Sequence, residues 1–311
     1  MHLLGDKPSK RTFKNCKSGF KELDEWLMKR GVSKVLVCME ATGRYGEALA
    51  EYTYSHGHLV VVANPAFISR HKESLNQHNK TDPTDAEAIA DYARCFRNRL
   101  RQWKPMDPDH KRLRDSIGQI YLLKKTLTAF RNRGACGLVD ESVKDSNLAT
   151  IRDLEEQLEA MEQLRDRLFE QLPALEMIRK IVDQVPGIGP EISNALAAKI
   201  DFEAFPTGRE LACFVACSSS EWKSGKQKRR GKQKKAGDKQ LRSLLRMGAA
   251  SALRTPFYRD FVDRLRRKGL SEKQIIGAVA RKMLLIAHAL VRKKQDFNAS
   301  FEHPLAKQRA A

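Results

Sequence analysis

The chain has 311 residues, 41% of them hydrophobic and 31% charged, which is typical of a globular protein large enough for two domains and a connecting element. Lysine and arginine number 58 against 38 aspartate and glutamate, and the formal charge of +20 favours a nucleic-acid partner because each neutralised phosphate releases counterions. No apolar run reaches the roughly 18 residues that span a bilayer, and the first 14 residues lack the apolar core of a signal peptide. The composition argues against a membrane protein and predicts a cytoplasmic location.

Strand and helix patterns alternate in the N-terminal third of the chain. Short, continuous apolar runs predict buried strands, and apolar residues at three- and four-residue steps predict helices. The expected elements are a short strand at Lys10–Lys14, a helix over Ser18–Arg30, a strand at Lys34–Met39, a helix from Thr42-Gly43 to about Ser55, a strand at Leu59–Ala63, and helices from about Ala66 and over Pro83–Phe96. This alternation predicts an α/β layer fold with a substantially parallel sheet.

Long helical patterns follow from about Asp107. Apolar residues recur from Leu113 to Leu127 and again from Leu148 to Leu168, with charges between them and a break near Gly134–Gly137. The pattern predicts an antiparallel helical hairpin or coiled coil, which commonly serves as a spacer or a dimer contact.

The last domain begins near Met177 and has a mostly helical pattern. We expect helices over Glu191–Ile200, Glu210–Ala216, Lys239–Leu253 and Ser271–Val291, a basic loop over Lys223–Gly237, and a disordered tail past Asn298. The predicted organisation is residues 1–105, 106–176 for the arm, 177–298 and a tail at 299–311. The six cysteines show no CxxC pair and no zinc-finger spacing, so they predict reduced thiols, with Cys213 and Cys217 packed in an apolar stretch.

Three acidic residues are candidates for a metal site. Glu40 follows a buried strand at its carboxyl end, where α/β sheets present functional groups. Asp82 precedes Pro83, which predicts a helix N-cap, and Asp85 lies three residues further on the same side. Carboxylate oxygens suit Mg²⁺. The alternative is purely structural: a cap, a favourable first-turn charge and a solvated strand end.

The segment Pro186-Gly-Ile-Gly189 is typical of a helix-hairpin-helix turn. Gly187 and Gly189 allow backbone N–H groups to approach a phosphate at a helix N-terminus. A plain turn between two helices is the alternative.

The basic loop combines cations, punctuating glycines and a serine at its start. A serine hydroxyl such as that of Ser224 can attack a phosphodiester when cations stabilise the transition state. The alternatives are a solvated charge run and an ordinary loop serine. The candidate phosphate contacts are Lys223, Lys226, Lys228, Arg229, Arg230, Lys232, Lys234, Lys235 and Arg242.

Five motifs occur in a characteristic order: Glu40-Ala-Thr-Gly43, Asn64-Pro65, Lys80-Thr-Asp-x-x-Asp-Ala86, Pro186-Gly-Ile-Gly189 and Ser224-Gly225. In this order they resemble the DEDD transposases of the Piv/MooV type, encoded by insertion sequences, some of which use a noncoding bridge RNA. The resemblance implies an RNase H/RuvC-like domain joined through a coiled coil to a smaller transposase domain with a helix-hairpin-helix motif. It also implies Mg²⁺ as cofactor, DNA and a noncoding guide RNA as partners, and a dimer or tetramer.

Carried over residue by residue, the resemblance makes Glu40 the second acid of the set, Asp82 and Asp85 the third and fourth, and Ser224 the nucleophile. The family's first aspartate lies on an opening strand that has no counterpart here, because no apolar strand leads into Asp6. We therefore expect a chain truncated at its N-terminus, with the first strand missing.

Two functions remain open at this point. The first is an active transposase that cuts and rejoins DNA. The second is a catalytically inactive nucleic-acid-binding regulator derived from a truncated transposase, which would share the positive charge and need no metal. A RuvC-like junction resolvase is a third possibility, but it leaves Ser224 and its domain unexplained.

Overall fold

The computed structural model describes residues 2–3, 9–41, 43–75, 81–217, 219–224, 227–233 and 237–298. The chain divides into two units, Met1–Met106 and Asp107–Ala311. The described residues are mostly helical, with small two-stranded sheets. The predicted disordered tail at 299–311 lies outside the described residues.

Two parallel strands form the centre of the N-terminal unit. Strand β3 (Leu36–Glu40) pairs with β4 (Leu59–Ala63), in a register that runs from Leu36 opposite Leu59 to Glu40 opposite Ala63. The backbone N–H of Trp103 donates to the carbonyl of Val60 at 2.7 Å, on the chain segment that leaves the unit. Both buried strands predicted from valine-rich runs are confirmed, and the first includes Glu40.

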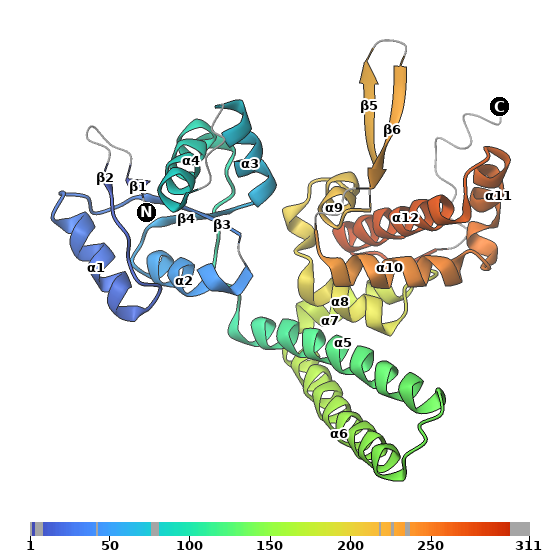
Figure 1. The fold of residues 1–311 in the computed structure, drawn as a ribbon. Coiled ribbons are helices and arrows are strands. Elements are labelled where there is room, and N and C mark those ends of the chain that lie inside the picture. The colour runs from blue at the N-terminus through green and yellow to red at the C-terminus, as the bar shows by residue number, and fades with distance from the viewer. Residues whose placement is uncertain are drawn as a thin grey trace. The chain divides into compact units, whose positions relative to one another are not determined.

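Helices cover both faces of this sheet (Figure 1). On one face Val37 and Val60 pack against Ala50 of α2 (Glu47–Ser55). On the other, Ala63 packs with Ile68 of α3 (Pro65–Ser74) and Tyr92 of α4 (Asp82–Cys95). These contacts confirm an α/β layer arrangement in the described part of the unit, while its RNase H/RuvC-like identity stays a prediction.

The remaining elements of this unit are β1 (His2–Leu3), β2 (Ser9–Lys10), α1 (Lys17–Met28) and two short 3-10 helices, η1 (Gly43–Gly46) and η2 (Arg97–Arg99). The strand predicted at Lys10–Lys14 is wrong, because the extended pairing ends at Lys10. The helix predicted to open at Thr42-Gly43 begins later. Gly43 takes a left-handed φ of +72°, which an α-helix does not tolerate, and a 3-10 turn precedes α2.

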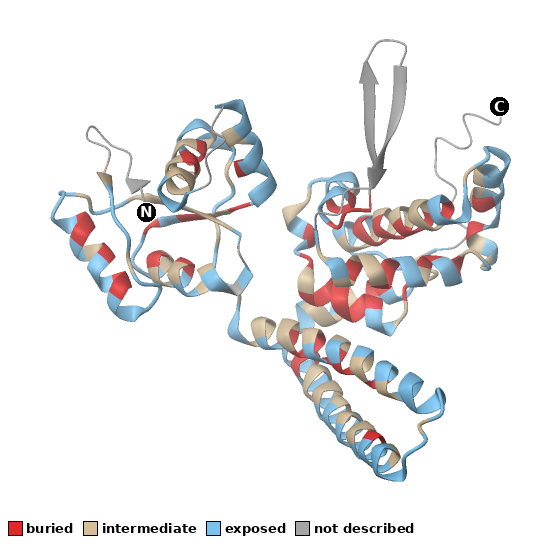
Figure 2. Ribbon diagram, viewed as in Figure 1, coloured by how far each residue is buried: buried red, intermediate tan, exposed pale blue. Residues whose placement is uncertain are grey.

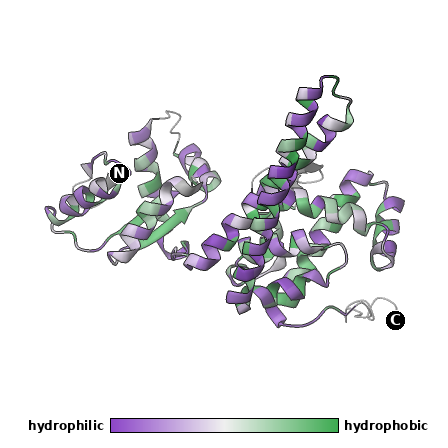
Figure 3. Ribbon diagram, turned by 90° about the horizontal axis from the view of Figure 1, so that it is seen from below, coloured by the Kyte–Doolittle hydropathy of each residue, from purple (hydrophilic) through white to green (hydrophobic). Residues whose placement is uncertain are grey.

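The long helical hairpin opens the second unit. Helices α5 (Pro108–Ala135) and α6 (Glu141–Gln171) begin at Asp107 and Asp140, whose carboxylates accept hydrogen bonds from first-turn N–H groups. Gly137, with a φ of +83°, lies in the turn between them. Hydrophilic and hydrophobic residues alternate along both helices (Figure 3). The two long helices predicted from the heptad-like pattern are confirmed.

A continuous helical core forms the rest of the second unit. Its elements are α7 (Pro173–Asp183), α8 (Pro190–Lys199), η3 (Phe202–Ala204), α9 (Gly208–Phe214), α10 (Lys239–Ala252), η4 (Pro256–Tyr258), α11 (Arg259–Arg267) and α12 (Glu272–Lys293). Figure 2 shows buried residues concentrated in α8, α10 and α12. Helix α11 was missed because arginines outnumber its apolar residues.

Helix α12 is long and apolar enough to cross a bilayer, but 44% of its most apolar stretch is buried in this core. Its buried residues include Val279, Met283 and Leu284, which pack in the same cluster as residues of α8 and α10. The helix is therefore a core element of the second unit.

The basic segment is a β-hairpin and not the predicted loop. Strand β5 (Ser219–Ser224) pairs antiparallel with β6 (Gln227–Gln233), and Ser224 lies opposite Gln227. Antiparallel pairing joins backbone N–H and C=O groups that a loop would leave to water. Gly231, which suggested loop punctuation, lies within β6.

Candidate active site and nucleic-acid interface

Glu40 is the last residue of β3, at the carboxyl end of the parallel pair. The pairing continues one residue beyond it, because the Ala41 N–H donates to the carbonyl of Ala63 at 2.9 Å. Successive side chains of a strand point to opposite faces, so Glu40 shares its face with Cys38, which packs beside Ile89 and Tyr92 of α4. The half-buried Glu40 therefore lies on the sheet face that α4 covers.

Helix α4 begins with a capping box made by two threonines. The Thr84 N–H donates to Thr81 Oγ1 at 3.4 Å, and the Thr81 N–H donates to Thr84 Oγ1 at 3.2 Å. The prediction that Asp82 is the N-cap is therefore wrong, because Thr81 takes that position. Asp82 is the exposed first helical residue. Capping does not account for its carboxylate.

Asp85 forms an ion pair with Lys72 of α3. Only 16% of the Lys72 side chain and 32% of the Asp85 side chain are exposed, so the pair is largely shielded from solvent. A cation, the Lys72 ammonium group, is therefore bound to the Asp85 carboxylate between α3 and α4.

The three acids do not form one metal-binding cluster in the described parts of the chain. There, the set of at least three His, Cys, Asp or Glu side chains whose ligand atoms lie within 4.8 Å of one another is His71, Asp91 and Cys95. Glu40 lies on β3, and Asp82 and Asp85 lie in the first turn of α4, but the three carboxylates do not meet at one point.

The Pro186–Gly189 turn joins α7 to α8. Gly187 has a φ of +89°, and a Cβ added to it would lie 2.6 Å from Ala252 Cβ. Gly248 of α10 approaches the same turn so closely that its own added Cβ would lie 2.2 Å from the Gly187 carbonyl oxygen. Gly187 is thus required by conformation and packing. At Gly189 a Cβ would meet nothing within 4 Å, and α8 begins there without a side-chain cap.

Three arginines gather near Cys217, just before the hairpin. Burial raises the pKa of the Cys217 thiol to about 11, and the charges of Arg242, Arg246 and Arg281 oppose that rise. Arg242 and Arg246 lie on α10 and Arg281 on α12. The prediction of a packed thiol is confirmed for Cys217 and wrong for Cys213, which is exposed on α9.

Several of the other predicted phosphate contacts lie on the two strands of the hairpin. Ser224 is the last residue of β5, and Lys223 is opposite Lys228 in the register. Arg229, Arg230 and Lys232 lie along β6. Lys226, Lys234 and Lys235 lie outside the described residues.

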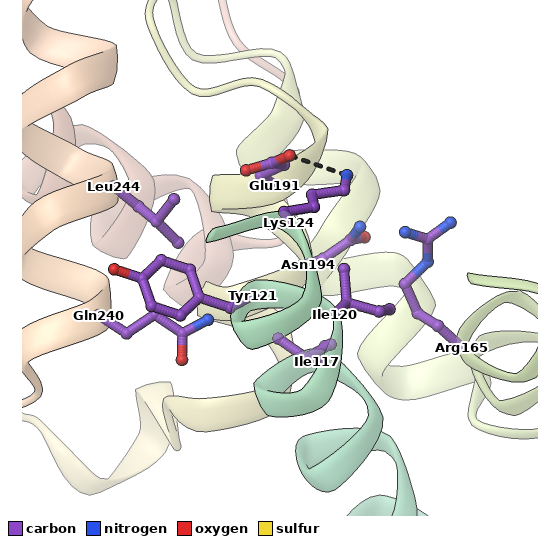
Figure 4. Close-up of a pocket in the computed structure, with 9 residues that line it drawn as sticks. All are labelled: Ile117, Ile120, Tyr121, Lys124, Arg165, Glu191, Asn194, Gln240 and Leu244. Atoms are coloured by element: carbon purple, nitrogen blue, oxygen red, sulfur yellow. Dashed lines mark hydrogen bonds and ion pairs between the residues drawn. The ribbon is translucent and has the colours of Figure 1, made fainter. Parts of the chain in front are cut away.

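A small crevice lies where the arm meets α8 and α10 (Figure 4). Lys124 of α5 contacts Glu191 Oε1 and Glu162 Oε1, both at 2.9 Å, and so joins α5 to the first turn of α8 and to α6. The Asn194 Oδ1 atom is buried without a hydrogen-bond partner among the described residues. The lining residues are Ile117, Ile120, Tyr121, Lys124, Arg165, Glu191, Asn194, Gln240 and Leu244. These contacts fix the N-terminus of α8 against the arm.

Comparisons with known proteins match both units. The profile of a DEDD transposase family of the IS110 type matches residues 1–140, and that of the transposase IS116/IS110/IS902 family matches residues 179–262. The pilin gene-inverting protein of Moraxella bovis is 32% identical over 297 residues, covering 92% of this chain and 90% of the relative. The chain belongs to the IS110 transposase family.

Two further relatives agree with this assignment. The pilin gene-inverting protein of Moraxella lacunata is also 32% identical over 92% of this chain and 90% of its own length. A probable family 20 transposase of Pseudomonas aeruginosa is 27% identical over 72% of this chain and 73% of its own length. The protein is thus a DNA transposase or recombinase, of a DEDD family that uses a divalent metal ion.

Sequence reasoning missed several side chains around these sites in the transposase. In the sequence, Lys72 and Arg281 look like ordinary surface charges of a helix. The packing of α3 on α4 brings Lys72 to Asp85, and the packing of α12 on α10 brings Arg281 near Cys217. His71 was missed because its partners lie 20 and more residues further along the chain. No local motif carries such a signal.

Proposed function

We propose that this transposase is a site-specific DNA recombinase of an insertion sequence, which cuts and rejoins DNA with an acid-bound Mg²⁺ and the Ser224 nucleophile. The observation that carries the proposal is the placement of Glu40 at the carboxyl end of β3, on the face covered by the helix whose first turn bears Asp82 and Asp85. The names of the Moraxella relatives, which refer to gene inversion, support recombination as the reaction.

The donor chemistry of Glu40, Asp82 and Asp85 fits a hard divalent cation. Three carboxylates supply the oxygen ligands that Mg²⁺ prefers, with water and substrate phosphate completing its shell. When bound, such an ion stabilises negative charge on a scissile phosphate. The ammonium group of Lys72 contacts Asp85, which supports a preference for positive charge at this position. Closure of the three acids around one ion then requires Asp85 to exchange Lys72 for the metal.

In the proposed chemistry the Ser224 hydroxyl oxygen attacks a phosphodiester. An Oγ–P bond forms, a P–O bond to the DNA strand breaks, and the leaving oxygen takes up a proton. The released strand end can later attack the serine phosphodiester and restore the hydroxyl, which conserves bond energy. The position of Ser224 at the end of β5, in a hairpin whose neighbouring residue pair is Lys223 and Lys228, supports this role.

The DNA and guide-RNA contacts are assigned to the second unit. The start of α8 has no side-chain cap, which supports a phosphate contact there, as in a helix-hairpin-helix. Phosphate contacts are then expected at Gly187, Gly189, Arg242 and the basic residues of the hairpin. Exposed apolar side chains on the arm, Leu122, Val139, Val143 and Leu148, support a homo-oligomer. We place the protein in the cytoplasm, with residues 1–105 catalytic, 106–176 the arm and 177–298 the transposase domain.

A specific observation favours the second candidate function, a catalytically inactive nucleic-acid-binding regulator. The three acids do not lie within 4.8 Å of one another in the described structure. Such a regulator would bind DNA and RNA through the same cations and would leave DNA uncut at every metal concentration.

The two functions are separated by a covalent-adduct assay. Purified full-length protein is mixed with labelled DNA carrying the element ends, the RNA transcribed from the element flank, and Mg²⁺, and adducts are resolved on denaturing gels. Ser224→Ala should remove the adduct and retain RNA binding, whereas Ser219→Ala, at the other end of β5, should retain both. An adduct that survives Ser224→Ala removes the serine from the mechanism, and the absence of any adduct and any cleavage supports the regulator.

A further inference from the structure

A cluster of three metal-ligating side chains joins α3 to α4, separate from the acids described above. His71 Nε2 lies 2.9 Å from Asp91 Oδ2, and the Cys95 thiol donates to the same oxygen at 3.7 Å. All three ligand atoms lie within 4.8 Å of one another. We propose that His71, Asp91 and Cys95 form a site for a borderline-soft divalent cation of the Zn²⁺ class.

Two of the three ligand separations are close to those of a tetrahedral zinc site. Ligand atoms of Cys, His and Asp around one Zn²⁺ lie roughly 3.3–3.7 Å apart, as follows from metal–ligand lengths of about 2.0–2.3 Å. The Cys95–Asp91 separation already has this length, and the His71–Asp91 separation must lengthen by a few tenths of an ångström. Asp91 and Cys95 are four residues apart on α4, so they share one helix face.

The imidazole of His71 is held in a fixed orientation. It packs edge-on against Tyr92 and Phe96, with ring centroids 5.7 and 5.8 Å apart. Only 9% of the His71 side chain is exposed. A ligand whose ring is already positioned loses little conformational entropy when a metal binds.

The two oxygens of Asp91 have different neighbours, and the cluster is open to solvent at Cys95. Arg94 donates to Asp91 Oδ1 at 2.5 Å, while Oδ2 lies next to His71 and Cys95. Cys95 is exposed, so an ion and a water ligand can enter from solvent. A thiolate ligand selects Zn²⁺ over Mg²⁺, so the two metals do not compete for this site.

The bound ion would act as a cross-link between two helices. His71 precedes Lys72, the partner of Asp85, and α4 carries both Asp82 and Asp85 in its first turn. A metal bridge between α3 and α4 would hold that turn against α3. The role is structural and does not depend on the recombinase chemistry.

The test is direct metal binding by the full-length protein after removal of bound metals with a chelator. Titration with Co²⁺ should give a near-ultraviolet thiolate-to-cobalt charge-transfer band, which Zn²⁺ abolishes and Mg²⁺ does not. Cys95→Ala should remove the band and weaken Zn²⁺ binding by at least about tenfold. Even the loss of a group that only hydrogen-bonds to a metal ligand typically lowers metal affinity by about that much. Cys136→Ala, at another exposed cysteine, should change neither.

Two further measurements keep the test decisive. Cys95 is exposed, so the metal-free unfolding temperature of Cys95→Ala should match that of the parent, and Zn²⁺ should raise this temperature only when Cys95 is present. His71→Gln should also remove the cobalt band. A parent protein without the band, or an unchanged band in Cys95→Ala, overturns the proposal.

Discussion

The two units of the transposase are stabilised in different ways. The second unit has one continuous hydrophobic cluster that runs through α8, α10 and α12. In the described residues of the N-terminal unit, the buried apolar side chains form three separate clusters of three residues each. Its helices α3 and α4 are joined in addition by polar contacts, Lys72–Asp85 and His71–Asp91. The comparison indicates a rigid scaffold that presents the hairpin and a less stable unit that presents the acids.

The largest expected effect on this comparison comes from matched truncations in the two cores. Leu245→Ala in α10 removes a fully buried side chain and should lower the free energy of unfolding by about 2–5 kcal/mol. Val60→Ala in β4, also fully buried, removes less volume and should cost roughly 1.5–3 kcal/mol. Urea unfolding monitored by fluorescence and by limited proteolysis should assign the two losses to different transitions. A single transition shifted by both variants would mean that the units unfold together.

Two glycines of one turn separate packing from phosphate binding. Gly187→Ala should lower the free energy of unfolding by about 1–3 kcal/mol because the residue has a left-handed φ and its Cβ would press on Ala252. Gly189→Ala should cost less than that, since its Cβ meets nothing within 4 Å. If the start of α8 grips phosphate, Gly189→Ala lowers DNA affinity in a binding titration. Unchanged affinity would leave this turn a structural feature.

Two neighbouring residues distinguish the helix cap from the acid. Thr81→Ala should cost about 1 kcal/mol because it removes the capping box of α4. Asp82→Asn should leave the unfolding temperature nearly unchanged and abolish DNA cleavage. Thermal unfolding and the adduct assay together check both outcomes. A large loss of stability in Asp82→Asn would show that Asp82 has a structural role.

The smallest effect concerns acid stability of the second unit. The pKa of Asp238 is lowered although burial acts to raise it, because the Leu241 N–H and Lys199 stabilise the carboxylate. Its contribution is present above the unfolded pKa of about 3.9 and is lost as the pH falls through the lower folded pKa. Asn caps a helix about as well as Asp, so Asp238→Asn should lose mainly the ion pair with Lys199, lower stability at neutral pH by up to about 1 kcal/mol, and flatten the pH dependence in the acid range. An unchanged acid transition would contradict this assignment.

The elements that sequence reasoning placed well are those with strong periodicity. The valine-rich strands, the arm helices and α12 follow from hydrophobic pattern alone. The hairpin was mistaken for a loop because lysine, glutamine and glycine are poor strand formers, and only cross-strand pairing stabilises them there. Asp82 was predicted as the N-cap in place of Thr81 because both residue types cap helices. Pro83 fits the first turn of the helix with either residue as the cap.

Candidate site residues could be named from the sequence only where a motif is local. Glu40, Asp82, Asp85 and Ser224 follow from the family's motifs and their order along the chain. The Lys72–Asp85 pair and the contacts of His71 with Asp91 and Cys95 depend on how α3 packs on α4, which the sequence pattern does not specify.

The central claim is that Glu40, Asp82 and Asp85 close around one metal ion during DNA cleavage. The most direct test is a crystal structure of the DNA-bound protein with Mn²⁺ in place of Mg²⁺, with the ion located by anomalous scattering. The account predicts an anomalous peak within coordination distance of all three carboxylates and a Lys72 ammonium displaced from Asp85. A DNA-bound structure in which the three carboxylates stay apart, with no Mn²⁺ peak beside them, would contradict it.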